Sequence, residues 1–259
     1  MDLGLAGRKA ILTGSTKGLG FACAMALARE GAEVTIVGRD PARLAAAAEK
    51  IRAETGATVH PVAGDVTQPE ARAAILAACP QPDILLNNAA GFPPGDFRQW
   101  DRDVWIAALD LMMLAPIEMI RLVVDGMMER GFGRILSITS RSVKIAQLEL
   151  GLSNGARSGL VGFTAGLARQ AARRGVTVNN LLPGIFDTDA QREHIEGMLD
   201  DMGQSFEQVW QQRADGNPTG RYGRAEELGA YFAFLCSQHA GFITGQNLLI
   251  DGGSYPGTY

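Results

Sequence analysis

The sequence contains little cysteine and no long apolar run. Only three cysteines occur among its 259 residues, and Cys23, Cys79 and Cys236 each stand alone in an apolar, helical-looking segment. We therefore expect buried, reduced thiols rather than a disulfide framework, a catalytic thiol or a metal site. No apolar stretch approaches the ~20 residues that cross a bilayer, and the first residues lack the apolar region and cleavage site of a signal peptide. These absences predict a cytoplasmic protein without membrane contact.

Clusters of basic charge are also missing. The formal net charge is -4, with 24 Lys and Arg against 28 Asp and Glu. No basic patch or amphipathic basic helix points to nucleic acid or a membrane as a partner, which leaves a small-molecule substrate. Apolar residues, in contrast, make up 46% of the chain, enough for a large core. No Pro/Ser-rich linker or charge run divides the chain, so residues 1–259 are predicted to form a single domain.

Short apolar runs alternate with helical patterns along the whole chain. Continuous apolar strands separated by helices are typical of a parallel sheet covered on both faces, so we predict an α/β fold of the Rossmann type: a doubly wound parallel sheet of about seven strands. In such folds ligands bind outside the carboxyl ends of the strands. The expected strands are 9–14, 33–38, 58–65, 83–91, 133–140, 176–184 and 246–251. The expected helices are about 18–30, 40–55, 69–79, 101–130, 153–174 and 226–237.

This alternation breaks between about residues 188 and 220. The segment is of mixed composition and predicts one or two short helices within a long insertion. A long insertion beside the mouth of an α/β site is usually a lid or part of a substrate pocket. We therefore expect this insertion to cover the substrate.

A glycine-rich turn, TGSTKGLG at residues 13–20, follows the first expected strand and opens the first helix. Gly14, Gly18 and Gly20 have the spacing Gly-x3-Gly-x-Gly. Without Cβ atoms such a turn lets the backbone approach a pyrophosphate, whose charge is stabilised at the helix N-terminus. The turn predicts a dinucleotide site formed by Gly14, Ser15, Thr16, Lys17, Gly18, Leu19 and Gly20.

The end of the second strand indicates which dinucleotide binds. NAD sites place an acidic residue there to bind the ribose hydroxyls, whereas this chain has Gly38 followed by Arg39. Together with Lys17, Arg39 would place two cations around a 2′-phosphate, which a guanidinium can bind through two hydrogen bonds. The sequence therefore predicts NADP(H) as the cofactor, with Asp65 after the third strand contacting the adenine.

These motifs resemble those of the classical short-chain dehydrogenase/reductase family, in particular its 3-oxoacyl carrier-protein reductases, over essentially the whole chain. The matching segments are TGSTKGLG, GDV at 64–66, NNAAG at 87–91, ILSITS ending at Ser140 and PGIFDTD at 183–189. Ala90 stands where the family usually has glycine, which narrows the gap slightly. The resemblance implies cofactor contacts at Asp65, Val66, Asn88, Ala90, Pro183, Gly184, Ile185 and Thr188.

The catalytic positions implied by the resemblance depart much further. In the family a serine lies thirteen residues before the tyrosine of Tyr-x-x-x-Lys, and here Ser140 lies thirteen residues before Ser153. Ser153 thus stands in place of the tyrosine and Arg157 in place of the lysine. The asparagine that the family carries in its central helix corresponds to Met112. All four tyrosines lie at position 222 or later, so no shift of register restores the motif.

Three functions stay open, because a serine hydroxyl is a far weaker acid than tyrosine and a guanidinium does not shuttle protons. The first is an atypical NADP(H)-dependent oxidoreductase that acts on a small, partly apolar carbonyl, alcohol or imine, with Ser140, Ser153 and Arg157 as catalytic residues. The second is a non-redox lyase or aldol-type enzyme in which these three residues bind an oxyanion. The third is a cofactor-binding protein without turnover. The first function needs a substitute acid unless the substrate is an iminium ion, and the candidates are Lys144, Glu149, Asp187 and His194.

The substrate and the assembly leave weaker traces in the sequence. Aromatic residues near the expected pocket indicate a partly apolar substrate, namely Phe92, Phe97, Trp100, Phe186 and Trp210. The expected helices 101–130 and 153–174 carry more apolar residues than a single buried stripe needs, which fits either ordinary core or a symmetric helix–helix interface. The resemblance implies a homo-oligomer, a tetramer or dimer, built through these two helices.

Overall fold

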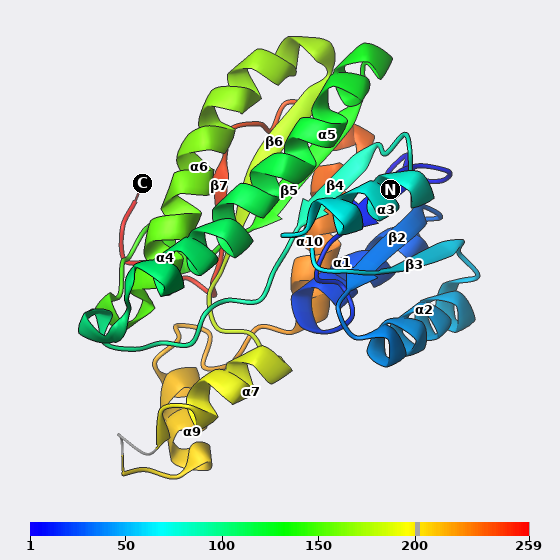
Figure 1. Ribbon diagram of the computed structural model, residues 1–259. Helices are drawn as coiled ribbons and strands as arrows, with labels where there is room; N and C mark the ends of the chain where they lie inside the picture. The colour runs from blue at the N-terminus through cyan, green and yellow to red at the C-terminus, as the bar shows by residue number, and fades with distance from the viewer. Residues whose placement is uncertain (200–202, 259) are drawn as a thin grey trace.

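Parallel strands at the centre of the molecule carry the apolar runs of the sequence (Figure 1). The computed structural model describes residues 1–199 and 203–258. Its strands are β1 (Lys9–Leu12), β2 (Glu33–Gly38), β3 (Val59–Ala63), β4 (Ile84–Asn87), β5 (Gly133–Ile138), β6 (Val176–Pro183) and β7 (Asn247–Ile250). They form one parallel sheet in the order β3-β2-β1-β4-β5-β6-β7. The predicted doubly wound α/β fold is therefore confirmed.

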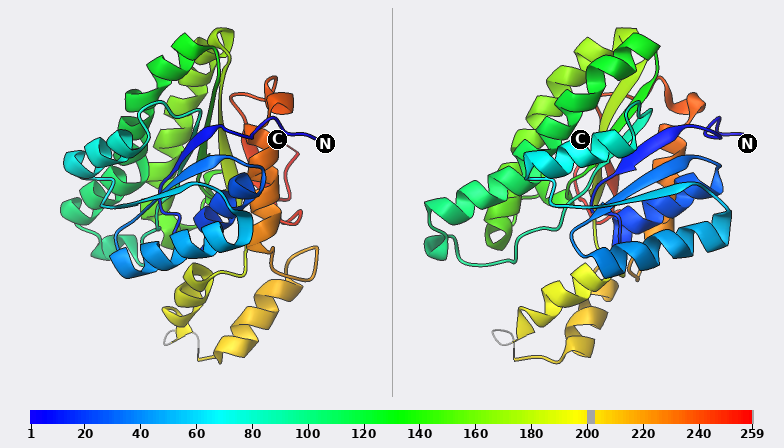
Figure 2. Two further views of the ribbon diagram at one scale, coloured as in Figure 1. Left: turned by 90° about the vertical axis from the view of Figure 1, so that its right-hand side faces the viewer. Right: turned by 45° about the vertical axis from the view of Figure 1, so that its right-hand side comes forward.

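Helices cover both faces of this sheet (Figure 2). One face carries α1 (Gly18–Arg29), α2 (Pro41–Thr55) and α10 (Ala225–Cys236), and the other carries α3 (Pro69–Ala78), α5 (Ala115–Arg130) and α6 (Gly151–Ala171). Successive residues of a strand point to opposite faces. Leu12 and Leu86 therefore pack in the first core, whereas Ile11 and Leu85 pack in the second. Burial on both sides explains why the strands are continuously apolar in the sequence.

Short polar and glycine signals fix the ends of the helices. The Asp40 carboxylate accepts hydrogen bonds from the backbone amides of Ala42 and Arg43 at 2.9 and 3.1 Å, and Pro41 occupies the first turn of α2. The same helix ends at Gly56, whose φ of 70° is in the left-handed region that favours glycine. Local signals of this kind let the sequence place α2 and β2 within a residue of their observed bounds.

The long helix expected at 101–130 is confirmed as a continuous helical run from Arg102 to Arg130, with a π-helical turn that the sequence analysis did not predict. The structure divides it into α4 (Arg102–Leu109), a π-helical turn (Asp110–Leu114) and α5, with Pro116 in the first turn of α5. Proline has no N–H and cannot bond the carbonyl four residues back, which is that of Met112. The backbone widens here, and the Ala115 amide donates to the Asp110 carbonyl five residues back. This turn lies beside the region where β4 ends.

The insertion at about 188–220 contains two described helices, α7 (Asp189–Glu196) and α9 (Phe206–Asp215), while residues 200–202 lie outside the described part. Both helices project from the carboxyl edge of the sheet, below the main body in Figure 1. The ring of Trp210 stacks on that of Tyr222, with ring centroids 3.9 Å apart. A bridge between Phe186 and Gly223 ties the two ends of the insertion together. The insertion is thus anchored at its base.

The cysteines are buried and form no disulfide. Burial raises the pKa of all three thiols, which makes them poor nucleophiles. Among residues 1–199 and 203–258 we find no group of three or more His, Cys, Asp and Glu side chains arranged to hold a metal ion. No helix in that part of the chain combines the length and the apolar character needed to cross a membrane.

Candidate active site

A cavity of about 410 Å³ lies at the carboxyl ends of the central strands, above the glycine-rich turn. Gly14 and Gly18 have φ values of 55° and 58°, in the region that only glycine adopts readily. Lys17 is the N-cap residue of α1, and its side chain makes no capping hydrogen bond, so no side chain occupies the first-turn amides of this helix. An uncapped helix N-terminus that faces a cavity is a site for an anion.

Most of the predicted cofactor residues line this cavity. They are Gly14, Thr16, Lys17, Gly18, Leu19, Arg39, Asp65, Val66, Asn88, Ala90, Pro183 and Thr188. Gly184 and Ile185 instead line the neighbouring cavity described below. The Ser15 hydroxyl donates to the Leu12 carbonyl at 2.7 Å and accepts from the Val37 amide at 3.2 Å, so its hydrogen bonds join β1 to β2. Gly20 lines neither cavity and has a packing role.

Asn88 and the glycines hold the turn in shape. The Asn88 side-chain amide donates to the Gly14 carbonyl at 2.7 Å, and the Thr13 hydroxyl donates to the Asn88 carbonyl at 2.9 Å. A Cβ atom on Gly20 would lie 2.3 Å from the Gly14 carbonyl oxygen, and one on Gly14 would lie 2.5 Å from that of Asn88. Both positions exclude a side chain because backbone occupies the space.

The predicted pair of cations is present, but only one of the two is free of an ion pair. The Lys17 ammonium lies 2.8 Å from the Glu193 carboxylate and 4.0 Å from that of Asp189, both on α7. Arg39 forms no ion pair within the described chain and is exposed at the rim. Arg43, one turn into α2, lines the same rim, and sequence reasoning missed it. Its place beside the Asp40–Pro41 helix start is the signal that could have found it.

Arg157 lies at the junction of this cavity with a second cavity of about 550 Å³, and it lines both. Its Nη1 donates to the carbonyls of Ile138 and Thr139 at 2.7 and 3.0 Å, which holds the guanidinium against the end of β5. Its Nε donates to Ser153 Oγ at 3.0 Å. Burial lowers the pKa of Arg157 to about 10, so the guanidinium keeps its charge at neutral pH.

The predicted catalytic residues are brought together at this junction. Ser140, Ser153 and Arg157 all line the larger cavity. Ser140 lies two residues after the end of β5, where it is the N-cap of a 3-10 turn, and its hydroxyl accepts from the Ser142 amide at 3.1 Å. Because a guanidinium can only donate, Ser153 Oγ is the acceptor in its bond to Arg157. The Ser153 proton is therefore available to a group in the cavity.

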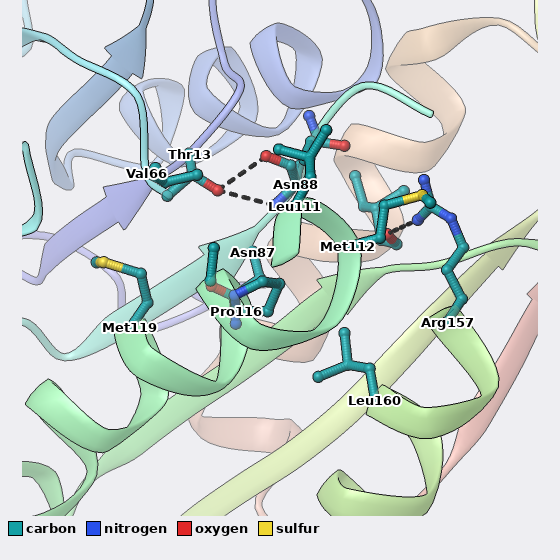
Figure 3. Close-up of a pocket in the computed structure, with 13 residues that line it drawn as sticks. Thr13, Val66, Asn87, Asn88, Leu111, Met112, Pro116, Met119, Arg157 and Leu160 are labelled. Carbon is teal, nitrogen blue, oxygen red and sulfur yellow. Dashed lines mark hydrogen bonds between the residues drawn. The ribbon is translucent and has the colours of Figure 1, made fainter. Parts of the chain in front are cut away.

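Met112 closes the opposite side of the Arg157 guanidinium. Figure 3 shows both side chains at one small cavity of about 10 Å³, bounded also by Thr13, Asn87 and Asn88. Met112 is 2% exposed and comes from the π-helical turn. A thioether is at best a weak hydrogen-bond acceptor. This side of the site therefore has no polar side chain from the central helix.

Two of the four candidate acids face the larger cavity. Glu149 and His194 line it, whereas Lys144 lies over the Tyr255 ring and Asp187 pairs with Arg192 at 2.7 Å. Burial and the nearby Arg213 charge lower the pKa of His194 below its ordinary value, while Glu149 opposes that shift. His194 is thus neutral near pH 7.

The aromatic residues contribute less to this cavity than the sequence indicated. Phe92 and Phe186 line it. Trp100 packs edge-on against Trp105 at 6.0 Å, and Trp210 stacks with Tyr222. Phe97 is 45% exposed at the surface. Most of the remaining lining is polar, including Arg141, Gln147, Gln191 and Arg213.

Comparison with known proteins identifies the architecture. Residues 14–255 match the family described as Enoyl-(Acyl carrier protein) reductase. The chain is 34% identical to the 3-oxoacyl-[acyl-carrier-protein] reductase of Pseudomonas aeruginosa, covering 98% of this chain and 99% of the relative. It is 32% identical to the acetoacetyl-CoA reductase of Shinella zoogloeoides, over 96% and 98% of the two chains. The chain belongs to the short-chain dehydrogenase/reductase family.

Solved structures of short-chain reductases agree closely with this fold. L-sorbose reductase from Gluconobacter frateurii, determined in complex with NADPH and L-sorbose, superposes with a TM-score of 0.93 at 30% identity and covers 99% of this chain and 100% of its own. YwfH, an NADPH-dependent reductase involved in bacilysin biosynthesis, gives a TM-score of 0.91 at 30% identity over 97% and 100% of the chains. The chain is thus a ketoreductase-like, NAD(P)-dependent oxidoreductase of the short-chain type.

Proposed function

We propose that this protein is an NADP(H)-dependent oxidoreductase that interconverts a small carbonyl or imine with its alcohol or amine, using Ser140, Ser153 and Arg157. The observation that carries the proposal is the position of Arg157: it is buried where the two cavities meet, and it donates to Ser153. A carbonyl seated at this junction would have a cation and two hydroxyls beside its oxygen.

The residues of the smaller cavity fit NADP(H). The uncapped N-terminus of α1 suits a pyrophosphate, and Arg39 and Arg43 suit the 2′-phosphate. The NADPH complex of L-sorbose reductase supports the same cofactor. When bound, NADPH supplies a hydride to the substrate carbon. Lys17 is committed to α7, so we give it the role of tying the insertion to the glycine turn. We assign the phosphate contact first to Arg39, with Arg43, which lies 3.9 Å from the Asp40 carboxylate, beside it.

Arg157 and Ser153 act on the substrate oxygen. As hydride reaches the carbon, negative charge develops on the oxygen, and donors that are already fixed in place stabilise that charge strongly. The Ser153 hydroxyl donates to this oxygen because its own oxygen is occupied by Arg157 Nε. Ser140, on the same cavity wall, is a second donor. The Arg157 guanidinium keeps its protons throughout the reaction and contributes its positive charge.

The proton that completes the product passes through Ser153. Ser153 releases its proton to the substrate oxygen only once that oxygen has become strongly basic. A water molecule in the open cavity then returns a proton to Ser153. An iminium substrate already carries its proton and needs no acid. His194 and Glu149 line the cavity and are the groups able to relay protons from solvent.

The same three residues would suit a non-redox reaction. An aldol-type lyase needs an oxyanion site and no hydride, and the Arg157–Ser153 pair provides such a site. The two functions differ in their dependence on nucleotide. Retained turnover after complete removal of nucleotide would assign the lyase, while tight NADPH binding without any turnover would assign a binding protein.

The purified protein should oxidise NADPH in the presence of at least one member of a panel of ketones, aldehydes and cyclic imines. The oxidation is measured as the loss of NADPH absorbance.

Arg39→Gln should weaken NADPH binding about 10- to 100-fold and NADH binding little, because charge-assisted bonds to the 2′-phosphate are lost. Lys50→Gln removes an exposed cation of α2 outside the cavity and is the matched control. If no compound of the ketone, aldehyde and imine panel causes NADPH oxidation while the cofactor is bound, the reductase proposal is rejected.

We also propose a dimer or tetramer built through α4, α5 and α6. Four apolar side chains are exposed on these helices and the π-helical turn, Ile106, Leu114, Leu122 and Phe163. Light scattering should give two or four times the chain mass of 27.5 kDa. Leu122→Glu with Phe163→Glu should lower that mass, whereas Leu148→Glu, at an exposed position elsewhere, should leave it unchanged. A monomeric wild-type protein at micromolar concentration contradicts the proposal.

A further inference from the structure

The wall of the larger cavity that belongs to the insertion is formed by hydrogen-bond donors. Gln191 and His194 lie three residues apart on α7 and so share one face of that helix. Arg213 comes from α9, which packs against α7. All three line the cavity together. Two separate helices therefore direct polar side chains at one space.

Within the described part of the chain these donors have no good acceptor. The Gln191 amide nitrogen is buried without a hydrogen-bond partner. Arg213 enters no ion pair there, and its hydrogen bond is to the Met198 sulfur, a weak acceptor, at 3.8 Å. A buried donor without an acceptor is costly, and a charged donor more so. An acceptor from a bound ligand would satisfy the donors that residues 1–199 and 203–258 leave without one.

Charged side chains on the exposed side of the same helix α7 have ion-pair partners. Arg192 pairs with Asp187 at 2.7 Å and stacks on Trp210. Glu193 pairs with Lys17 at 2.8 Å. Arg192 is therefore neutralised by a carboxylate, whereas Arg213 has no carboxylate partner among residues 1–199 and 203–258.

The charge of the whole cavity points the same way. Among the described residues, three arginines line it, Arg141, Arg157 and Arg213, against one acidic residue, Glu149. Arg141 donates to Ser254 and Arg157 to backbone carbonyls and Ser153, so neither pairs with a carboxylate of the described part of the chain. An anionic ligand would restore the balance.

We propose that the substrate carries a carboxylate, bound by Arg213, Gln191 and His194, while its carbonyl or imine carbon lies at Ser153 and Arg157. This inference rests on the proposed function and names the substrate class: oxo acids or imino acids. A carboxylate has a single charge and two acceptor oxygens, which match one permanent cation and two neutral donors. A phosphate carries about two negative charges and would meet Glu149, the carboxylate that faces His194.

Equilibrium binding tests the inference apart from turnover. The protein is saturated with NADP⁺, which prevents reduction of a ketone, and titrated by calorimetry with levulinate and with levulinamide, its uncharged analogue. Levulinate should bind at least about 10-fold more tightly. Arg213→Gln should remove this preference. Arg192→Gln makes the same charge change on the outside of the insertion and should keep it.

A second variant tests whether the effect of Arg213→Gln comes from a general disordering of the insertion rather than from the lost charge. Gln191→Glu is nearly isosteric and places a negative charge beside the proposed carboxylate, so it should weaken levulinate and leave levulinamide unchanged. Levulinate affinity should also rise as the pH falls from about 8 to about 6, because a bound anion favours the protonated form of His194, which Arg213 and burial otherwise disfavour. Glu149 is the other charged side chain that faces His194.

The outcomes separate the two proposals. Equal affinities for levulinate and levulinamide, or equal losses in Arg213→Gln and Arg192→Gln, overturn the carboxylate site and leave the reductase standing. A clear levulinate preference without NADPH oxidation in any assay supports the site and rejects the reductase. Inorganic phosphate that binds more tightly than levulinate, at the same residues, would overturn the choice of carboxylate.

Discussion

Replacing Arg157 by methionine should lower kcat/KM about 10²- to 10³-fold, with the larger part of the loss in kcat. Removing one preorganised donor from an oxyanion site has an effect of this size. Arg157 supplies the buried charge at the junction and fixes Ser153 through its Nε. Methionine fills similar space but provides neither. Steady-state kinetics with the best substrate of the panel provides the measurement.

Two further variants tell charge apart from geometry. Arg157→Lys keeps the cation, but an ammonium on a flexible stem cannot reproduce the planar bonds to Ile138, Thr139 and Ser153. It should recover part of the activity. Ser153→Ala should lose about 10- to 10²-fold because the proton donor goes while the charge remains. If Arg157→Met keeps wild-type kcat with an unchanged melting temperature, our assignment of the reaction centre is wrong.

Gly20→Ala should destabilise the protein by about 1–3 kcal/mol and weaken NADPH binding about 10²-fold. The new Cβ would lie 2.3 Å from the Gly14 carbonyl oxygen and 2.7 Å from the Asn88 amide nitrogen. Overpacking against backbone costs free energy in this range, and a displacement of about 1 Å in a binding turn has large functional effects. Thermal melting and NADPH calorimetry measure the two quantities.

Gly166→Ala is the control for this change. Gly166 lies inside α6, and a Cβ atom there would meet nothing within 4 Å. Alanine is favoured over glycine in a helix interior, so this variant should be stabilised by up to about 1 kcal/mol and bind NADPH normally. Normal cofactor affinity in Gly20→Ala would show that the glycine turn does not hold the cofactor.

The sequence predicted the sheet and most helices because their signals are local. An apolar run of strand length or a proline near a helix start acts within a few residues. The bounds of the central helix were predicted, but its π-helical turn was not, because the effect of Pro116 inside an apolar helical pattern depends on how the widened turn packs against its neighbours. Met112 lies in that turn, which places its side chain at the same small cavity as Arg157.

The site was predicted in part. Glycine spacing and the resemblance indicated the cofactor turn and the junction residues, and these residues line the two cavities. The Ser15 hydroxyl instead forms hydrogen bonds with the backbone of Leu12 and Val37 in the sheet, which the glycine spacing could not predict. Gln191 and Arg213 had no motif, since polar residues in a mixed insertion resemble solvated surface. Only the packing of α7 on α9 distinguishes them.

By itself, the sequence determined a parallel sheet with a glycine-rich turn after its first strand and the absence of the usual tyrosine and lysine. These follow from residue type and short-range spacing. The tertiary structure alone decided that Arg157 donates to Ser153 between two cavities and that Lys17 is tied to Glu193 across 176 positions. It also decided that Arg213 lines the larger cavity without an ion pair to any described residue. Such contacts depend on which faces meet when the helices pack, and hydrophobic burial over the whole molecule fixes that arrangement.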